Sequence, residues 1–93
     1  MKEELTMSTI EQLREQIEHT DADIIKKLAK RQKLAKQIGQ LKSEQGKDVV
    51  DLLREKILFE FYEELSAKHN LQQTFVKRLF KLIISYSKKV QKS

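Results

Sequence analysis

Residues 8–42 read STIEQLREQIEHTDADIIKKLAKRQKLAKQIGQLK, and this stretch decides the fold. It contains no proline, and its apolar residues recur three or four positions apart or at multiples of that spacing, which is typical of an amphipathic helix. Ser8 and Glu11 form a capping-box pattern that marks the beginning of the helix. The polar residues 43–48 include a glycine and mark its end. The sequence therefore predicts one long first helix over about residues 8–42.

Two shorter helices follow it. Residues 43–48 are expected to form the first loop, with Asp48 as a candidate cap for the second helix. Apolar spacing predicts that helix over about residues 49–68 and, after a short polar break, a third helix over about residues 72–91. With no proline and only two glycines, the chain has little from which to build strands and tight hairpins. We expect an all-α chain with a single domain over residues 1–93.

Composition excludes several kinds of chemistry. The chain has no cysteine, so it can form neither a disulfide nor a thiolate nucleophile or metal ligand. Its two histidines, His19 and His69, are too few for an ordinary zinc centre and are expected to face solvent. No metal or other cofactor is expected. No segment approaches the ~18 apolar residues of a membrane helix and the first residues lack the apolar core of a signal peptide, so a cytoplasmic protein without membrane contact is expected.

The length of the first helix points to self-association. A helix over residues 8–42 is about 50 Å long, which exceeds the diameter of a globule formed by a chain of this size. One chain therefore cannot cover the whole apolar stripe, and a second copy is the simplest source of cover. Tyr62 and Phe80 are expected in the core, whereas Phe59 and Phe61 are candidates for the dimer contact.

Eight polar side chains fall on the predicted core-facing stripes of the three helices, taking 100° per residue. An unpaired buried charge costs several kcal/mol, so the set needs an explanation. Frayed helix ends and long side chains that reach water explain any one of these residues, but they explain all eight less well. The eight residues are Arg14, Arg31, Lys42, Asp51, Arg54, Glu55, Ser87 and Gln91.

Spacing along the first helix restricts how three of these residues can meet. Arg14 and Lys42 are 28 residues apart and hence about 42 Å apart along one helix, too far for one small ligand. Arg31 and Lys42 are about 16 Å apart, so their side chains can converge. If two copies of this helix pair antiparallel about a midpoint near residue 25, Arg14 of the partner subunit lies between Arg31 and Lys42. A symmetric dimer then has two identical pockets, each built from both chains.

These residues, in this order and spacing, resemble the all-helical class of chorismate mutase. The segments LREQIEHTDADII, REKIL and RLFKLIISYSKKVQ are similar to that family's sequence around the eight positions, over about residues 10–91. The resemblance implies an intertwined homodimer of three-helix protomers. It also implies an isomerase that rearranges chorismate to prephenate, without a cofactor, on the route to phenylalanine and tyrosine. No further domain follows the third helix, so a free-standing enzyme is expected.

The resemblance assigns roles to the cations and to the last polar residue. Arg31 and Arg14 of the partner subunit would clamp a substrate carboxylate, because planar guanidinium groups suit bidentate contacts. Lys42 and Gln91 would donate hydrogen bonds to the ether oxygen of chorismate. An amide at position 91 would donate at any pH, whereas a glutamate there could donate only when protonated.

The remaining residues would hold the other groups of the substrate. By the same resemblance, Glu55 would accept a hydrogen bond from the substrate hydroxyl. Ser87 and the start of the second helix around Asp51 would hold the second carboxylate, and Arg54 would order these acidic neighbours. Asp51 equally fits a plain structural role, as a negative charge at a helix N-terminus.

Three alternatives stay open. An isochorismate–pyruvate lyase of the same fold would keep the cationic clamp, although Arg54-Glu55 together with Ser87 favours the mutase, because the lyase relatives tend to lose these groups. The basic run KKLAKRQKLAKQ suggests a nucleic-acid-binding protein, but basic residues fall on several faces and no known binding motif is present, so no nucleic acid partner is expected. A coiled-coil scaffold requires apolar residues along its seam, where the first helix carries three cations.

Overall fold

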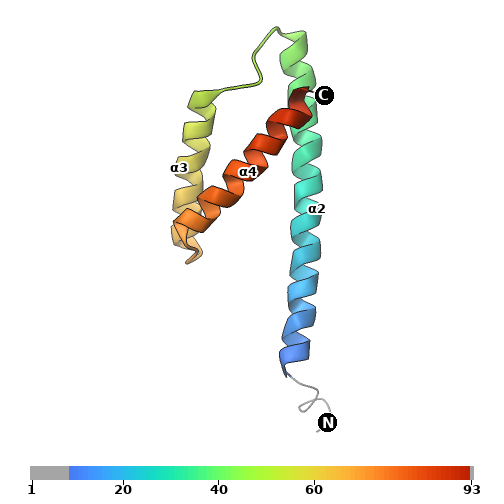
Figure 1. The fold of residues 1–93 in the computed structure, drawn as a ribbon, viewed down its shortest axis with the longest axis vertical. Coiled ribbons are helices and arrows are strands. Elements are labelled where there is room, and N and C mark those ends of the chain that lie inside the picture. The colour runs from blue at the N-terminus through green and yellow to red at the C-terminus, as the bar shows by residue number, and fades with distance from the viewer. Residues whose placement is uncertain (1–8, 93) are drawn as a thin grey trace. The chain divides into compact units, whose positions relative to one another are not determined.

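A computed structural model describes residues 9–92, which form three α-helices (Figure 1). They are α2 (Thr9–Glu44), α3 (Leu52–Lys68) and α4 (Gln73–Lys92). The described residues contain no strand, so the all-α prediction is confirmed. Each helix boundary lies within three residues of its predicted position. No helix in this part of the chain is both long enough and apolar enough to cross a membrane. The predicted cap Ser8 lies outside the described residues.

The chain divides into two compact units, Met1–Arg31 and Gln32–Ser93, and α2 contributes to both. In the first unit every described side chain is exposed except that of Arg31, which is half-buried. Its large apolar side chains are between 37% and 67% exposed, and they are Ile10, Leu13, Ile17, Ile24, Ile25 and Leu28. The apolar stripe predicted on this part of the helix is therefore present but not covered by the chain itself.

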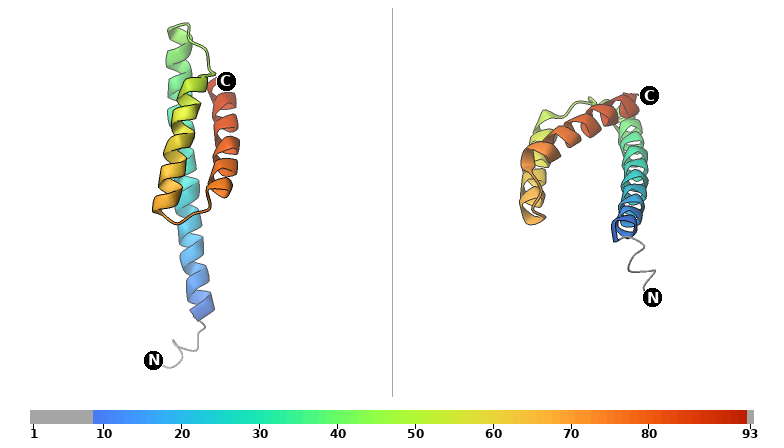
Figure 2. Two further views of the ribbon diagram at one scale, coloured as in Figure 1. Left: turned by 90° about the vertical axis from the view of Figure 1, so that its left-hand side faces the viewer. Right: turned by 60° about the horizontal axis from the view of Figure 1, so that its bottom comes forward.

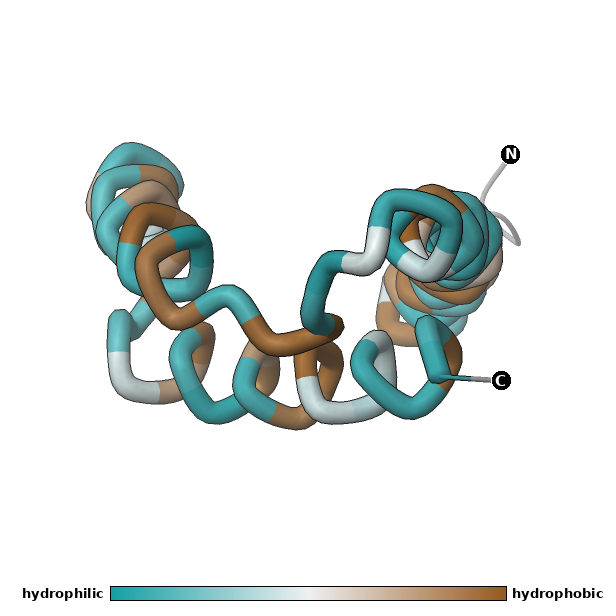
Figure 3. The backbone as a smooth tube through the Cα atoms, turned by 90° about the horizontal axis from the view of Figure 1, so that it is seen from above, coloured by the Kyte–Doolittle hydropathy of each residue, from teal (hydrophilic) through white to brown (hydrophobic). Residues whose placement is uncertain are grey.

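The core of the second unit lies between α3 and α4, which pack side by side (Figure 2). Tyr62, Val76 and Ile84 are buried, and the Tyr62 ring stacks on Phe80 with ring centroids 4.1 Å apart. Phe59 meets the same tyrosine edge-on, with centroids 5.5 Å apart. Figure 3 shows apolar and polar segments alternating along both helices, as expected for amphipathic elements. The prediction that Tyr62 and Phe80 belong to the core is confirmed, and Phe59 also packs against it.

The C-terminal end of α2 is fixed by a Schellman motif. Gly46 has a φ of +67°, which glycine adopts without steric cost. Its backbone N–H donates to the Ser43 carbonyl at 3.2 Å, and the N–H of Lys47 donates to the Lys42 carbonyl at 2.7 Å. The sequence prediction of a glycine-containing loop after the first helix is confirmed, and the motif sets the backbone position of Lys42.

The end of α3 repeats the same motif with asparagine in place of glycine. Asn70 has a φ of +56°, and its N–H donates to the Ala67 carbonyl while that of Leu71 donates to the Ser66 carbonyl. Asparagine is one of the few side chains that tolerate this conformation, because it is short and polar. The chain thereby reverses within a few residues, and α4 returns along α3.

The predicted cap of the second helix is wrong. The helix begins at Leu52, and its N-cap is Asp51, whose Oδ1 accepts a hydrogen bond from the backbone N–H of Arg54 at 3.0 Å. Asp48 and Asp51 both precede apolar residues, but the turn after Asp48 begins with Val49 and Val50. These β-branched residues lose side-chain freedom in a helix, whereas the two leucines after Asp51 lose little.

Candidate active site

Six of the eight predicted site residues lie in the second unit, where α2 ends, α3 begins and α4 ends (Figure 1). Two contacts tie these helix ends together. Glu55 in the first turn of α3 pairs with Lys88 on α4, and Gly39 near the end of α2 touches the backbone of Gln91. The six residues are Lys42, Asp51, Arg54, Glu55, Ser87 and Gln91.

Lys42 occupies the last turn of α2 and is half-buried. Its ammonium group donates to the backbone carbonyl of Val49 at 2.9 Å. The lysine therefore spans the loop between α2 and α3, and its charge lies beside the segment that leads into the Asp51 cap. The sequence did not predict this carbonyl partner, because the path of a loop is not fixed by helical spacing.

Asp51 and Arg54 differ from the prediction that they face the core, since both are exposed. They belong to the N-cap and first turn of α3, where a helix has fewer neighbours than at its centre. The Asp51 side chain caps the helix, so the structural role that its position suggested is confirmed. A contact of either residue with a substrate stays a prediction.

Glu55 is half-buried, and its Oε2 lies 2.8 Å from the ammonium nitrogen of Lys88. From the sequence, Arg54 is expected to order Glu55 and its acidic neighbours. Lys88 is not predicted as the ion-pair partner of Glu55. Lys88 follows Ser87 directly and lies four residues beyond the buried Ile84, so it stands at the border of the α4 stripe. That position is the one signal in the sequence that could have identified it.

Ser87 and Gln91 continue the buried stripe of α4, as predicted. Ser87 is 7% exposed, and its hydroxyl donates to the Ile83 carbonyl at 2.9 Å. Gln91 is half-buried, and its Oε1 atom is buried with no hydrogen-bond partner among the described residues. A buried amide oxygen without a partner is costly, so this end of α4 is suited to a polar ligand rather than to packing alone.

Gly39 was not predicted as part of the site. It is buried together with Ala35 on α2, and a Cβ added to it would come within 2.5 Å of the Gln91 carbonyl oxygen and 2.6 Å of the Gln91 Cα. Only a residue without a side chain allows the two backbones to approach this closely. Gly39, which lies one turn before Lys42 on α2, thus sets how closely Gln91 of α4 approaches that helix.

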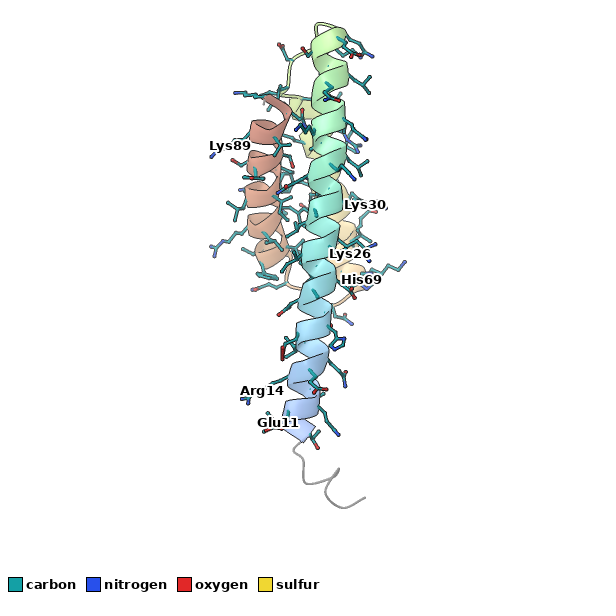
Figure 4. All side chains as sticks on the ribbon, turned by 90° about the vertical axis from the view of Figure 1, so that its right-hand side faces the viewer. Glu11, Arg14, Lys26, Lys30, His69 and Lys89 are labelled. Atoms are coloured by element: carbon teal, nitrogen blue, oxygen red, sulfur yellow. The ribbon has the colours of Figure 1, made fainter. Side chains whose placement is uncertain are left out.

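Arg14 and Arg31 belong to the first unit. Arg14 is exposed and extends from the surface of α2 (Figure 4). Arg31 is half-buried. The first turn of α2 also carries Glu11, three residues before Arg14.

The side chains near these helix ends offer both hydrogen-bond donors and an acceptor to a small polar ligand. Lys42 supplies a cation, Ser87 and Gln91 supply neutral polar groups, and Glu55 supplies an acceptor. The residues that the structure describes contain no group of three or more His, Asp or Glu side chains that could hold a metal ion. His19 and His69 are both exposed, as predicted.

Comparison with known proteins shows which family the chain resembles in sequence. Residues 13–92 match the family model described as chorismate mutase type II. A chorismate mutase of Methanocaldococcus jannaschii is 30% identical over 81 residues, which cover 87% of this chain and 82% of that protein. A bifunctional chorismate mutase/prephenate dehydratase of Buchnera aphidicola is 40% identical over 79 residues, and one of Escherichia coli K12 is 37% identical over 75 residues. The chain spans about a fifth of the length of these bifunctional relatives, 20% and 19%.

Proposed function

This chain belongs to the chorismate mutase type II family, and we propose that it catalyses the rearrangement of chorismate to prephenate. The proposal rests on two contacts of the C-terminal part of α4 in the second unit, the Glu55–Lys88 ion pair with α3 and the close approach of Gly39 on α2 to Gln91. Lys42, Glu55 and Gln91 come from three different helices. Lys42 lies three residues after Gly39, and Glu55 pairs with Lys88, three residues before Gln91. In our proposal these residues bind one substrate, because a cation, a hydrogen-bond donor and an acceptor suit a dianion with an ether and a hydroxyl.

The reaction is a concerted rearrangement, so it needs no nucleophile and no obligatory proton transfer. The protein has to hold the folded conformer of the substrate and stabilise the negative charge that develops on the ether oxygen. In our proposal Lys42 and the amide nitrogen of Gln91 donate to that oxygen. Donors fixed in a site that excludes water can supply accelerations of order 10⁶ or more.

The other polar residues hold the rest of the substrate in this proposal. Glu55 accepts a hydrogen bond from the hydroxyl, and Ser87 binds a carboxylate together with the start of α3 at Asp51. Arg54, exposed on the first turn of α3, balances the charge of the acidic residues around it. Half-burial of Glu55 and burial of Ser87 support these roles, because polar contacts are stronger where water is excluded.

We also propose that the enzyme is a homodimer with pockets built from both chains. The apolar stripe of residues 10–28 is exposed in the single chain, and a second copy would cover it. Arg14 is 28 residues from Lys42, or about 42 Å along a continuous helix, so it would enter the pocket from the partner subunit. There Arg31 and Arg14 of the partner subunit would clamp a substrate carboxylate.

Subunit complementation tests the function and the assembly together. Arg14→Ala and Arg31→Ala should each abolish the loss of chorismate, measured by its ultraviolet absorbance, while the native mass stays that of a dimer. When the two inactive variants are unfolded, mixed in equal amounts and refolded, half of the dimers contain one chain of each kind. Each mixed dimer has one intact pocket, so about a quarter of the wild-type activity should return.

Three results would count against the proposal. A wild-type protein that does not convert chorismate refutes the function, and release of salicylate and pyruvate from isochorismate instead would identify the lyase. A monomeric native mass refutes the assembly. Active single variants, or mixtures that recover no activity, refute the sharing of Arg14 and Arg31 between the two chains.

A further inference from the structure

Two lysine–glutamate ion pairs connect α3 to α4. The ammonium nitrogen of Lys88 lies 2.8 Å from Oε2 of Glu55, and that of Lys77 lies 2.6 Å from Oε1 of Glu63. The side chains of the first pair are 31% and 24% exposed, those of the second 40% and 42%. The two pairs join the same helices at similar nitrogen–oxygen distances, but only the more buried one contains a residue of the candidate site.

We propose that Lys88 is a positioning residue of the active site, which holds Glu55 so that its second carboxylate oxygen meets the substrate hydroxyl. This inference rests on the proposed function. A carboxylate has two oxygens, each able to accept hydrogen bonds, and the ion pair engages Oε2. Oε1 is left to accept from the substrate. Lys88 touches the glutamate and not the reacting atoms.

Orientation is the first reason for this assignment. A glutamate side chain has several rotatable bonds, and fixing it in one conformation at the moment of binding costs affinity. Lys88 holds Glu55 from a second helix before the substrate arrives. Because Lys88 directly follows Ser87, the same turn of α4 carries a proposed carboxylate ligand and the residue that fixes the proposed hydroxyl ligand.

Charge is the second reason. The proposed substrate carries two carboxylates, and Glu55 and Asp51 add two negative charges at the beginning of α3. Like charges repel more strongly where water is partly excluded. The ammonium group of Lys88 lies directly on the Glu55 carboxylate, so it offsets this repulsion while it leaves Glu55 an acceptor.

The test replaces each lysine by methionine, which keeps a long apolar side chain and removes the charge. Lys88→Met should lower kcat/KM for chorismate about tenfold or more, and Lys88→Arg should restore it to within about threefold of wild type. The matched control is Lys77→Met, which cuts the other ion pair between the same helices and should change kcat/KM by less than about twofold. In a Glu55→Gln background, Lys88→Met should cost less than about twofold, because the two residues act as one unit.

A substrate analogue separates positioning from general stability. For a chorismate analogue in which hydrogen replaces the hydroxyl, Lys88→Met should lose clearly less activity than it does with chorismate, because the contact that Lys88 supports is missing and only the charge effect remains. The proposal is overturned if Lys88→Met keeps kcat/KM within twofold of an active wild type, if Lys77→Met loses as much, or if the analogue is affected as strongly as chorismate. A wild type that leaves chorismate unchanged would refute the proposed function and this inference with it.

Discussion

We predict that Gly39→Ala lowers kcat/KM for chorismate much more than it lowers the stability of the fold. A Cβ at this position would lie 2.5 Å from the Gln91 carbonyl oxygen, whereas ordinary contacts of this kind begin at 3.4 Å. The nearest atoms belong to backbone, which cannot turn aside as the end of a side chain can. The last turn of α4 must therefore withdraw from α2 by about 0.9 Å, the difference of the two distances.

This displacement moves Gln91 away from Lys42, its proposed partner on the ether oxygen. A misplacement of about 1 Å can cost a reaction about 100-fold, so kcat/KM for chorismate should fall by about that factor. The effect on folding should be smaller. Overpacking costs about 1–3 kcal/mol, and alanine offsets about 1 kcal/mol of this because it favours a helix more than glycine does.

The assay is the initial rate of chorismate loss together with thermal unfolding followed by circular dichroism. Gln40→Ala is the matched control, because Gln40 is the next residue on α2 and is exposed. It should keep kcat/KM within about twofold. If Gly39 acts through Gln91, adding Gly39→Ala to a Gln91→Ala variant should cost less than about threefold. A helical Gly39→Ala protein with nearly wild-type kcat/KM would refute the reasoning, and so would a full 100-fold loss in the Gln91→Ala background.

Two further predictions concern single hydrogen bonds. Asp51→Ala removes the cap of α3 and should lower the free energy of unfolding by about 1 kcal/mol in urea titrations. Asp51→Asn keeps a capping side chain and should change it by only a few tenths of a kcal/mol. Equal losses from both variants would show that the cap is not the cause. Gln91→Glu should lower activity at neutral pH, because a carboxylate cannot donate, and activity should rise as the pH falls toward about 4.3, the ordinary pKa of glutamate. A pH–rate profile that matches the wild type would remove Gln91 from the ether oxygen.

The helices were predictable because local physics determines them. Apolar spacing placed three helices, and the glycine after the first one marked its end, where the Schellman motif lies. The cap of α3 was missed because Asp48 and Asp51 both satisfy the simple rule of a polar residue before an apolar run. The two valines between them disfavour a helical turn after Asp48, but this effect is small and is not visible in the spacing of apolar residues.

Residues of the candidate site were predictable only where a polar side chain falls on a helix face that is expected to be buried. Lys42, Ser87 and Gln91 stood out because polar groups are unusual on a core-facing stripe. Lys88 and Gly39 did not stand out, since a lysine at the edge of a stripe and a glycine in a helix each have many ordinary explanations. Their contacts depend on how two helices approach one another, and the spacing of apolar residues along one helix does not reveal this.

The stripe of α4 shows why its C-terminal part fits a binding role better than a packing role. Val76 and Ile84 are buried and apolar, yet beyond them the same stripe places the polar Ser87 and Gln91, both at least half-buried, beside the half-buried Val90. Continuing it with leucine would add apolar burial worth about 1.5–3 kcal/mol per side chain, and it would avoid the buried unpaired oxygen of Gln91. A chain of 93 residues has little stability to spare, and the substrate contacts proposed for Ser87 and Gln91 would explain why this end of the stripe is polar.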